Sequence, residues 1–161
     1  MTKLLSANLL RLRKSMLFWG CLILMLLLGA GFTLQRYWEQ IAYAEFGQLS
    51  YLDEVLFRHG LLIGIVTALF VPMFFGIEYS DGAIRNKMVV GHSRLSIYFA
   101  NLITAAASSL AFCAAYILAV LALGVPLLNG VRLTAVQCAL LMLGTLVLSA
   151  AFSALYTFVA M

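Results

Sequence analysis

The sequence predicts an all-α polytopic membrane protein with four transmembrane spans, preceded by an amphipathic helix that lies in the membrane interface. Hydrophobic residues make up 65% of the 161 residues and charged residues only 10%, against about 45–50% and about 25% in soluble domains. Six acids and ten bases are too few to cover a globular protein of this size with charge. The apolar residues also gather into four runs, each long enough to cross a hydrocarbon core of about 30 Å.

Residues 1–15 are predicted to form the interfacial helix. At about 100° per residue, one stripe of this helix collects the apolar side chains Leu5, Leu9, Leu12 and Met16, while Leu4 and Leu10 fall outside it. The opposite side and its flank collect the cations Lys3, Arg11, Arg13 and Lys14. Such a helix lies flat among lipid headgroups with its cations toward anionic lipid. The alternative is that the segment merely extends the first span on the cytoplasmic side.

The first span is predicted over residues 16–34, a stretch without a charged residue. The second span is predicted over residues 60–77, after a polar segment whose tyrosines and tryptophan suit the membrane interface. Pro72 lies near the far end of the second span, where a proline removes a backbone hydrogen bond and usually bends the helix. Gly60 and Gly64 have G-x-x-x-G spacing, which is a weak indication of close helix contact.

The third span, residues 97–125, is rich in alanine and serine, whose small side chains let helix backbones approach closely. We expect Ser108 and Ser109 in this span to bond to backbone carbonyls rather than act as nucleophiles, because neither has a base nearby. A short turn leads to the fourth span, residues 134–161. These four runs and the preceding helix divide the chain into an interfacial segment and one transmembrane domain.

The distribution of cations predicts the orientation of the chain. The N-terminal segment and the loop after the second span carry seven lysines and arginines, and the other two loops carry three. Cytoplasmic loops of membrane proteins carry the excess of Lys and Arg. We therefore expect the N-terminus and that loop to face the cytoplasm of a bacterial cell, and with four spans the C-terminus faces it too.

The sequence carries no motif for catalysis or for a cofactor. It contains neither a G-x-x-x-x-G-K-[ST] phosphate loop nor an H-E-x-x-H pair, and no acid at a span centre that would mark a proton path. Cys21, Cys113 and Cys138 lie in apolar runs without C-x-x-C spacing and are expected to be packing residues. His59 and His92 lie in opposite loops. We expect no enzyme activity, metal or cofactor in this chain, and no nucleic-acid binding, since no basic stripe with interleaved aromatic residues lies outside the spans.

The polar loop at residues 78–96 carries the most specific pattern. The sequence from Gly76 to Ile103 is GIEYSDGAIRNKMVVGHSRLSIYFANLI. It resembles the cytoplasmic loop of ABC-2 type permeases, where the pattern is roughly E-x-x-x-G-[TA]-[IL]-R, followed by G-x-S-R and an aromatic residue. The amphipathic N-terminal segment and the long first extracellular loop also agree with that family. The resemblance covers essentially the whole chain, although only these 28 residues are specific.

The resemblance implies a permease that pairs with a second permease copy or paralogue and is driven by a separate ATP-binding subunit, which would hydrolyse the ATP. It also implies that the loop forms a short coupling helix that docks on that subunit. On the matching positions, Glu78 is the acid at the end of the second span, Gly82 the break before the coupling helix, and Arg85 the base within it.

The residue types of the loop suit this role on physical grounds. Gly82 can take a positive φ and separate two helices. Ile84 and Met88 are four residues apart and offer an apolar face. Basic side chains that can pair with acids on a partner or with lipid phosphate are Arg85, Lys87 and Arg94. If the loop is bound by a partner subunit, movement of that subunit can be transmitted through the loop to the spans. Pro72 gives the second span a point at which it can bend.

The resemblance departs from the family in one respect: the family has six spans, and four are predicted here. We therefore expect either a truncated permease fragment or a shortened relative. The function favoured by the resemblance is a subunit of an exporter, whose substrate could be a drug, a lipid-like molecule or an antimicrobial peptide. The alternatives are a non-transporting membrane protein of immunity or scaffold type, and a small carrier driven by an ion gradient, which the lack of an intramembrane acid disfavours.

Overall fold

The computed structural model describes residues 2–43, 49–80, 82–91 and 93–160, with the backbone alone at residues 2–3, 78–80 and 83–85. Its helices are α1 (Thr2–Lys14), α2 (Met16–Ala42), α3 (Leu52–Leu56), α4 (His59–Ser80), α5 (Ala83–Val89), α6 (Arg94–Leu127) and α7 (Ala135–Ala160). The described residues form no strand beyond one isolated bridge between Tyr51 and Asn129. The predicted all-α fold is therefore confirmed.

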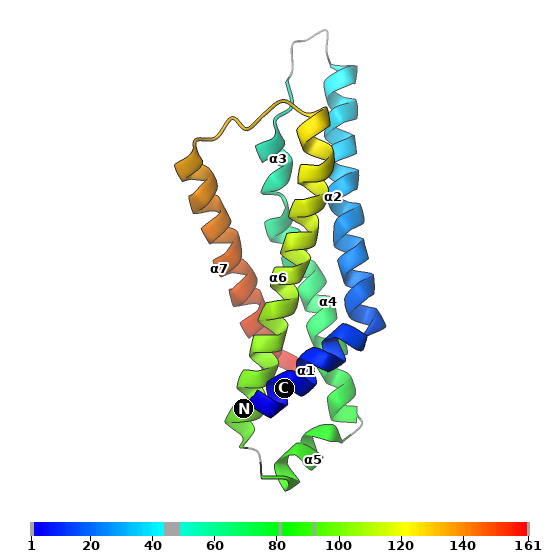
Figure 1. Cartoon of the computed structure of the whole chain (residues 1–161), viewed down its shortest axis with the longest axis vertical. Coiled ribbons are helices and arrows are strands. Elements are labelled where there is room, and N and C mark those ends of the chain that lie inside the picture. The colour runs from blue at the N-terminus through cyan, green and yellow to red at the C-terminus, as the bar shows by residue number, and fades with distance from the viewer. Residues whose placement is uncertain (1, 44–48, 81, 92, 161) are drawn as a thin grey trace.

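Four of these helices are long and apolar enough to cross a membrane: α2, α4 together with α3 before it, α6 and α7. They run along the long axis of the molecule, while α1 lies across the bundle near one end (Figure 1). We call this end, where α5 joins α4 to α6, the α5 end, and the opposite end, where α2 stops and α3 lies, the α3 end. The start of α1 and the end of α7 both lie toward the α5 end (Figure 1). The prediction of four spans is confirmed.

The helix bounds differ from the predicted spans mainly at the α3 end. The first span was predicted to stop at residue 34, but α2 continues to Ala42. Its last turns are polar and are bridged along the helix, because Arg36 pairs with Glu39 at 2.9 Å and Gln35 also donates to Glu39 at 2.9 Å. Helix α6 likewise includes Pro126, which was predicted to begin a turn. Hydropathy located the apolar cores of the helices and missed their polar ends.

Helix α6 is the centre of the bundle and contacts α1, α2, α3, α4 and α7. Its Phe112 is fully buried, and its ring centroid lies 5.7 Å from that of Phe18 on α2 and 5.3 Å from that of Phe70 on α4. Aromatic pairs at these separations add to the stability gained from burial. Three spans thus share one aromatic core.

Hydroxyl groups inside the spans bond to their own helices. Ser108 donates to the carbonyl of Ala105 at 2.8 Å, and Ser109 donates to that of Ala106 at 2.9 Å. The prediction for these two serines is confirmed. A buried hydroxyl satisfied in this way does not need a partner on another helix, so small polar residues can line the interior of the bundle.

Helix α7 joins the bundle through a narrow stripe. Ser149, Ser153 and Thr157 are the only buried residues among those described in α7, whereas none of residues 135–148 is buried. Beside this stripe, Phe152 of α7 meets a glycine of α4: a Cβ at Gly64 would lie 2.8 Å from the ring of Phe152. The close helix contact expected from the Gly60–Gly64 spacing is therefore confirmed at Gly64. The first half of α7 leans away from the other helices (Figure 1).

Candidate functional site

The α5 end brings together the segments that carry the predicted site residues: the last turns of α4, the whole of α5, the first turns of α6, and α1. Glycines with positive φ lie on both sides of α5, Gly82 at +67° before it and Gly91 at +93° after it. Residues with a Cβ rarely adopt this left-handed conformation. Gly82 thus has the backbone geometry expected for a break between α4 and α5, and the loop forms the short helix that was expected.

The described end of α5 exposes apolar side chains. Val89 is 86% exposed and Val90 is 76% exposed, and Met88 is exposed beside them. Lys87 is partly buried, and Arg94 is exposed at the start of α6. Residues 88–90 thus form a small apolar surface, with the basic residue Lys87 before it and Arg94 after it in the sequence.

Three predicted site residues, Glu78, Ile84 and Arg85, belong to α4 and α5 by their backbone, and their side chains lie outside the described part of the structure. Ile84 and Met88 were predicted to form the apolar face, and Val90 was not part of this prediction. The signal for Val90 was present, because two adjacent valines precede Gly91 in an otherwise polar loop. Helical periodicity alone did not identify Val90, because this residue lies just beyond the end of α5.

Helix α4 runs unbroken through Pro72, which is exposed on its surface. The proline has no N–H to donate to the carbonyl four residues earlier, so this point is the weakest in the helix. The residues from Met73 to Ser80 form the segment between the proline and the loop that carries α5. A bend at Pro72 stays a prediction.

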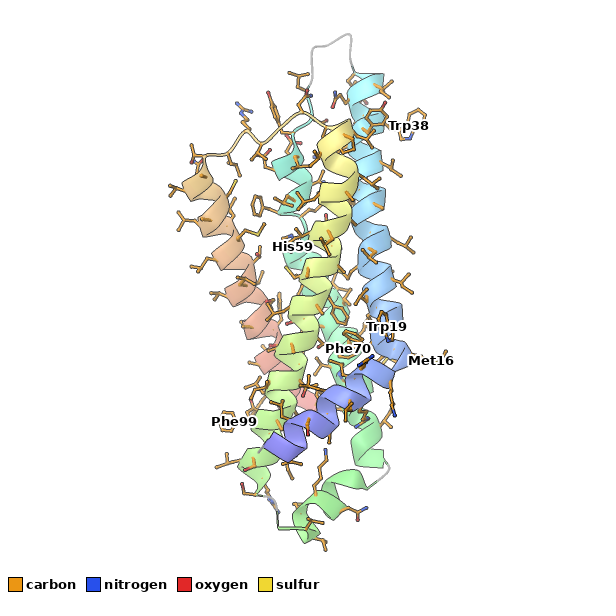
Figure 2. The ribbon with its side chains drawn as sticks, viewed as in Figure 1. Met16, Trp19, Trp38, His59, Phe70 and Phe99 are labelled. Carbon is orange, nitrogen blue, oxygen red and sulfur yellow. The ribbon has the colours of Figure 1, made fainter. Side chains whose placement is uncertain are left out.

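Helix α1 uses a different face from the one that was predicted. Among the side chains described in α1, Leu4, Asn8 and Leu12 are buried, whereas Leu9 is 41% exposed and Met16, the first residue of α2, is 90% exposed. Figure 2 shows Met16 and Phe99 pointing away from the bundle and Phe70 pointing into it. The predicted apolar stripe is therefore divided: Leu12 packs on protein, Leu5 is partly buried, and Leu9 and Met16 face outward.

Two polar contacts attach α1 to the bundle. Asn8 Nδ2 donates to Oδ1 of Asn101 on α6 at 2.8 Å, and both residues are buried. Arg11 Nη2 donates to the carbonyl oxygen of Phe74 on α4 at 2.9 Å, and its guanidinium lies 4.7 Å from the centroid of the Phe74 ring. Arg11 was predicted to face lipid headgroups with the other cations. This prediction is corrected, because Arg11 binds the end of α4 while Arg13 and Lys14 remain exposed.

The α3 end carries a separate polar cluster. His59, predicted to lie in a loop, is the first residue of α4 and is fully buried; its Nδ1 bonds to the carbonyl of Leu56, and its Nε2 has no hydrogen-bond partner among the described residues. The hydroxyl of Tyr116 donates to the carbonyl of Val55 at 2.9 Å, which attaches α3 to α6. Within the described residues no three His, Cys, Asp or Glu side chains lie together as metal ligands would.

Four apolar helices able to span a membrane, with a short glycine-bounded helix between the second and third, define a polytopic α-helical membrane protein. The model of the family described as ABC-2 family transporter protein matches residues 4–161, and the chain belongs to that family. Comparison with curated proteins and with solved structures found no matching protein or structure. Membrane proteins of the ABC-2 family generally work with an ATP-binding subunit.

Proposed function

We propose that this chain is the permease subunit of an ATP-driven exporter in the bacterial plasma membrane, and that α5 is the docking point for a separate ATP-binding subunit. That subunit hydrolyses the ATP, and this chain has no catalytic role. A second permease copy or paralogue completes the membrane part of the transporter. The family membership supports the transporter role, and the proposal adds the partner, the direction and the docking site.

The observation that carries the docking site is the exposure of Val89 and Val90 at the tip of the α5 end. Fully burying a valine side chain stabilises a complex by about 1.5 kcal/mol, so covering both would favour association. The charged neighbours Lys87 and Arg94 fit a partner groove with an apolar floor and acidic rims. The glycines on both sides separate α5 from α4 and α6, so that a partner can bind α5 as a distinct helix.

The orientation of the chain also supports this site. Seven of the ten lysines and arginines belong to the N-terminal segment and the loop after the second span, and both of these lie at the α5 end. This excess of cations favours a cytoplasmic location for this end, where ATP is available. The start of α1 and the end of α7 lie on the same side of the bundle (Figure 1), in keeping with two cytoplasmic termini.

The experiment is co-purification in lipid nanodiscs of this chain with the ATP-binding subunit that is co-expressed with it. The variant is Val89→Asp/Val90→Asp, and the matched control is Val131→Asp, a similar change at an exposed position of the α3 end. We expect the wild type and the control to retain the ATP-binding subunit and to stimulate its ATPase activity. The double variant should lose both properties while remaining folded.

Two results would contradict the docking site. One is equal binding by the double variant and the wild type. The other is equal loss of binding with Val131→Asp, which would mean that charge on any exposed loop impairs assembly. Failure of the wild-type chain to bind the ATP-binding subunit would favour a non-transporting membrane protein instead.

A further inference from the structure

The two helices that carry α5 need to be held at a fixed spacing if the loop between them is to keep its shape. Helix α4 enters this loop after Pro72, the point where its own hydrogen bonding is weakened. Helix α6 leaves the loop at Arg94. Helix α1 packs on α6 and reaches α4 through the side chain of Arg11.

On α6, the attachment of α1 is the amide pair Asn8–Asn101. Asn8 is 3% exposed and Asn101 is 0% exposed, and Asn101 lies about two turns from the start of α6. Leu4, one turn before Asn8, packs in a small cluster with Ile97 and Ala100 of α6. Sliding α1 by one turn along α6 would break the 2.8 Å hydrogen bond and leave the buried amide of Asn8 without this partner, at a cost of about 1–3 kcal/mol. The amide pair therefore fixes the register of α1 on α6.

On α4, the attachment is made by Arg11. Its guanidinium donates to the carbonyl oxygen of Phe74 and lies over the ring of the same residue. Phe74 is only two residues beyond Pro72, so the contact is on the segment that leads to α5. A hydrogen bond from a charged donor is stronger than one between neutral groups. Arg11 therefore binds the part of α4 in which Pro72 weakens the backbone hydrogen bonding.

We propose that α1 is a strap that sets the spacing between the end of α4 and the start of α6, and that Asn8, Arg11 and Asn101 are its positioning residues. Through this spacing α1 determines the geometry of the loop that carries α5. The polar contacts of the strap act on position more than on stability, because a hydrogen-bonded pair replaced by apolar groups of the same shape is nearly neutral in free energy of unfolding. The proposal concerns the chain alone and does not depend on an ATP-binding partner.

The test is a spin-label distance measurement on the full chain in nanodiscs, with Cys21, Cys113 and Cys138 replaced by alanine. One label pair is at Ile77 on α4 and Phe99 on α6, both about half exposed at the α5 end. A second pair, at Leu34 on α2 and Val125 on α6, reports on the α3 end. The strap variant is Asn8→Leu/Arg11→Met/Asn101→Leu, which removes the polar contacts and keeps the branched shape of the side chains at positions 8 and 101.

We expect the distance distribution of the 77–99 pair to broaden about twofold in the strap variant, since a weakly held segment samples open states. The distribution of the 34–125 pair should not change. The matched control is Arg13→Met/Lys14→Met, which removes two exposed cations from the same helix. This control should leave both distributions as in the wild type.

An unchanged 77–99 distribution in the strap variant would overturn the proposal. Equal broadening of both label pairs would also overturn it, because it would indicate general loosening of the bundle. Broadening of the 77–99 pair by Arg13→Met/Lys14→Met would assign the effect to lipid attraction instead. If the triple variant does not fold, Arg11→Met alone provides the test, with partial broadening expected for the 77–99 pair only and an unchanged distribution overturning the role of Arg11.

Discussion

Gly29 on α2 lies directly against the backbone of Tyr116 on α6. A Cβ added at Gly29 would be 2.9 Å from the carbonyl oxygen of Tyr116 and 3.0 Å from the Cβ of Ala119. Neither atom is at the end of a flexible side chain, so neither can move aside without shifting a helix. This contact is where the first span and the central span of the bundle approach each other closely.

Gly29→Ala should therefore destabilise the protein by about 1–3 kcal/mol, as expected for an added methyl group in a packed interior. The measurement is thermal unfolding in nanodiscs. The matched control is Gly20→Ala on the same helix, where a new Cβ would have no neighbour within 4 Å. The control should be neutral or slightly stabilising, because alanine favours helix by about 1 kcal/mol over glycine. Equal melting temperatures for the two variants would mean that α2 and α6 are more loosely packed than this contact indicates.

Gly64→Ala should be milder than Gly29→Ala, although the distance is similar. A Cβ at Gly64 would lie 2.8 Å from the ring of Phe152, at atoms toward the far end of that side chain. A ring can rotate away at a cost of about 0.5–1.5 kcal/mol, whereas a carbonyl oxygen within a helix cannot. Thermal unfolding of the two variants side by side tests this ranking. A larger loss for Gly64→Ala would indicate that Phe152 is fixed by its neighbours on α7.

Tyr116→Phe removes the hydrogen bond that attaches α3 to α6. The hydroxyl of Tyr116 donates to the carbonyl of Val55 at 2.9 Å, and both residues are fully buried. Loss of the hydroxyl leaves the carbonyl without this donor, so we expect a destabilisation of about 1–2 kcal/mol in thermal unfolding. Relative to the wild type, the variant should also show faster hydrogen exchange of the amides in α3, with α7 less affected. Tyr98→Phe, at a partly buried site on α6, serves as control, and a similar loss there would remove the case for a special role of Tyr116.

Arg36 should contribute little to stability although it pairs with two acids. Its distances are 2.9 Å to Glu39 and 3.6 Å to Glu54, and all three side chains are about one-third exposed. Exposed pairs of this kind contribute about 0–1 kcal/mol and are screened when the Debye length falls to about 3 Å at 1 M salt. We expect Arg36→Met to lower the melting temperature slightly at low salt and not at 1 M salt. A loss independent of salt would point to packing of the arginine stem rather than to charge.

The four spans could be predicted from the sequence because each depends on one property, the length of an apolar run. The polar ends of the helices could not be predicted in this way. Residues 35–42 extend α2 although they carry Arg36 and Glu39, which pair along one face of the helix. Such charged residues lower the mean hydropathy and so shorten the predicted span, although they are paired in the folded helix.

The face of α1 could not be predicted because its partners are distant in sequence. Asn8 and Asn101 are 93 residues apart, and Arg11 and Phe74 are 63 apart. The predicted stripe assumed a single apolar environment, the membrane, whereas α1 also packs against protein through Leu4, Asn8 and Leu12. An asparagine among apolar neighbours, such as Asn8 in α1, was the available signal, because a buried amide requires a partner.

Gly82 was predicted from the sequence as a helix break, and its conformation allows a graded test. Its φ of +67° lies in the left-handed region, and no atom of the described residues lies within 4 Å of the position of a new Cβ. Substitution therefore acts only through the backbone. The left-handed conformation costs about 1–2 kcal/mol for alanine and more for a β-branched residue, and it is tolerated best by asparagine. Hydrogen exchange of the amides in α5 should therefore accelerate in the order Gly82→Asn, Gly82→Ala, Gly82→Val, while exchange in α7 stays constant.

The control is Gly76→Ala, which also meets no neighbouring atom and lies inside α4 without a positive φ. It should leave α5 unchanged. Equal exchange in all three variants at position 82 would mean that the junction between α4 and α5 does not require the left-handed conformation.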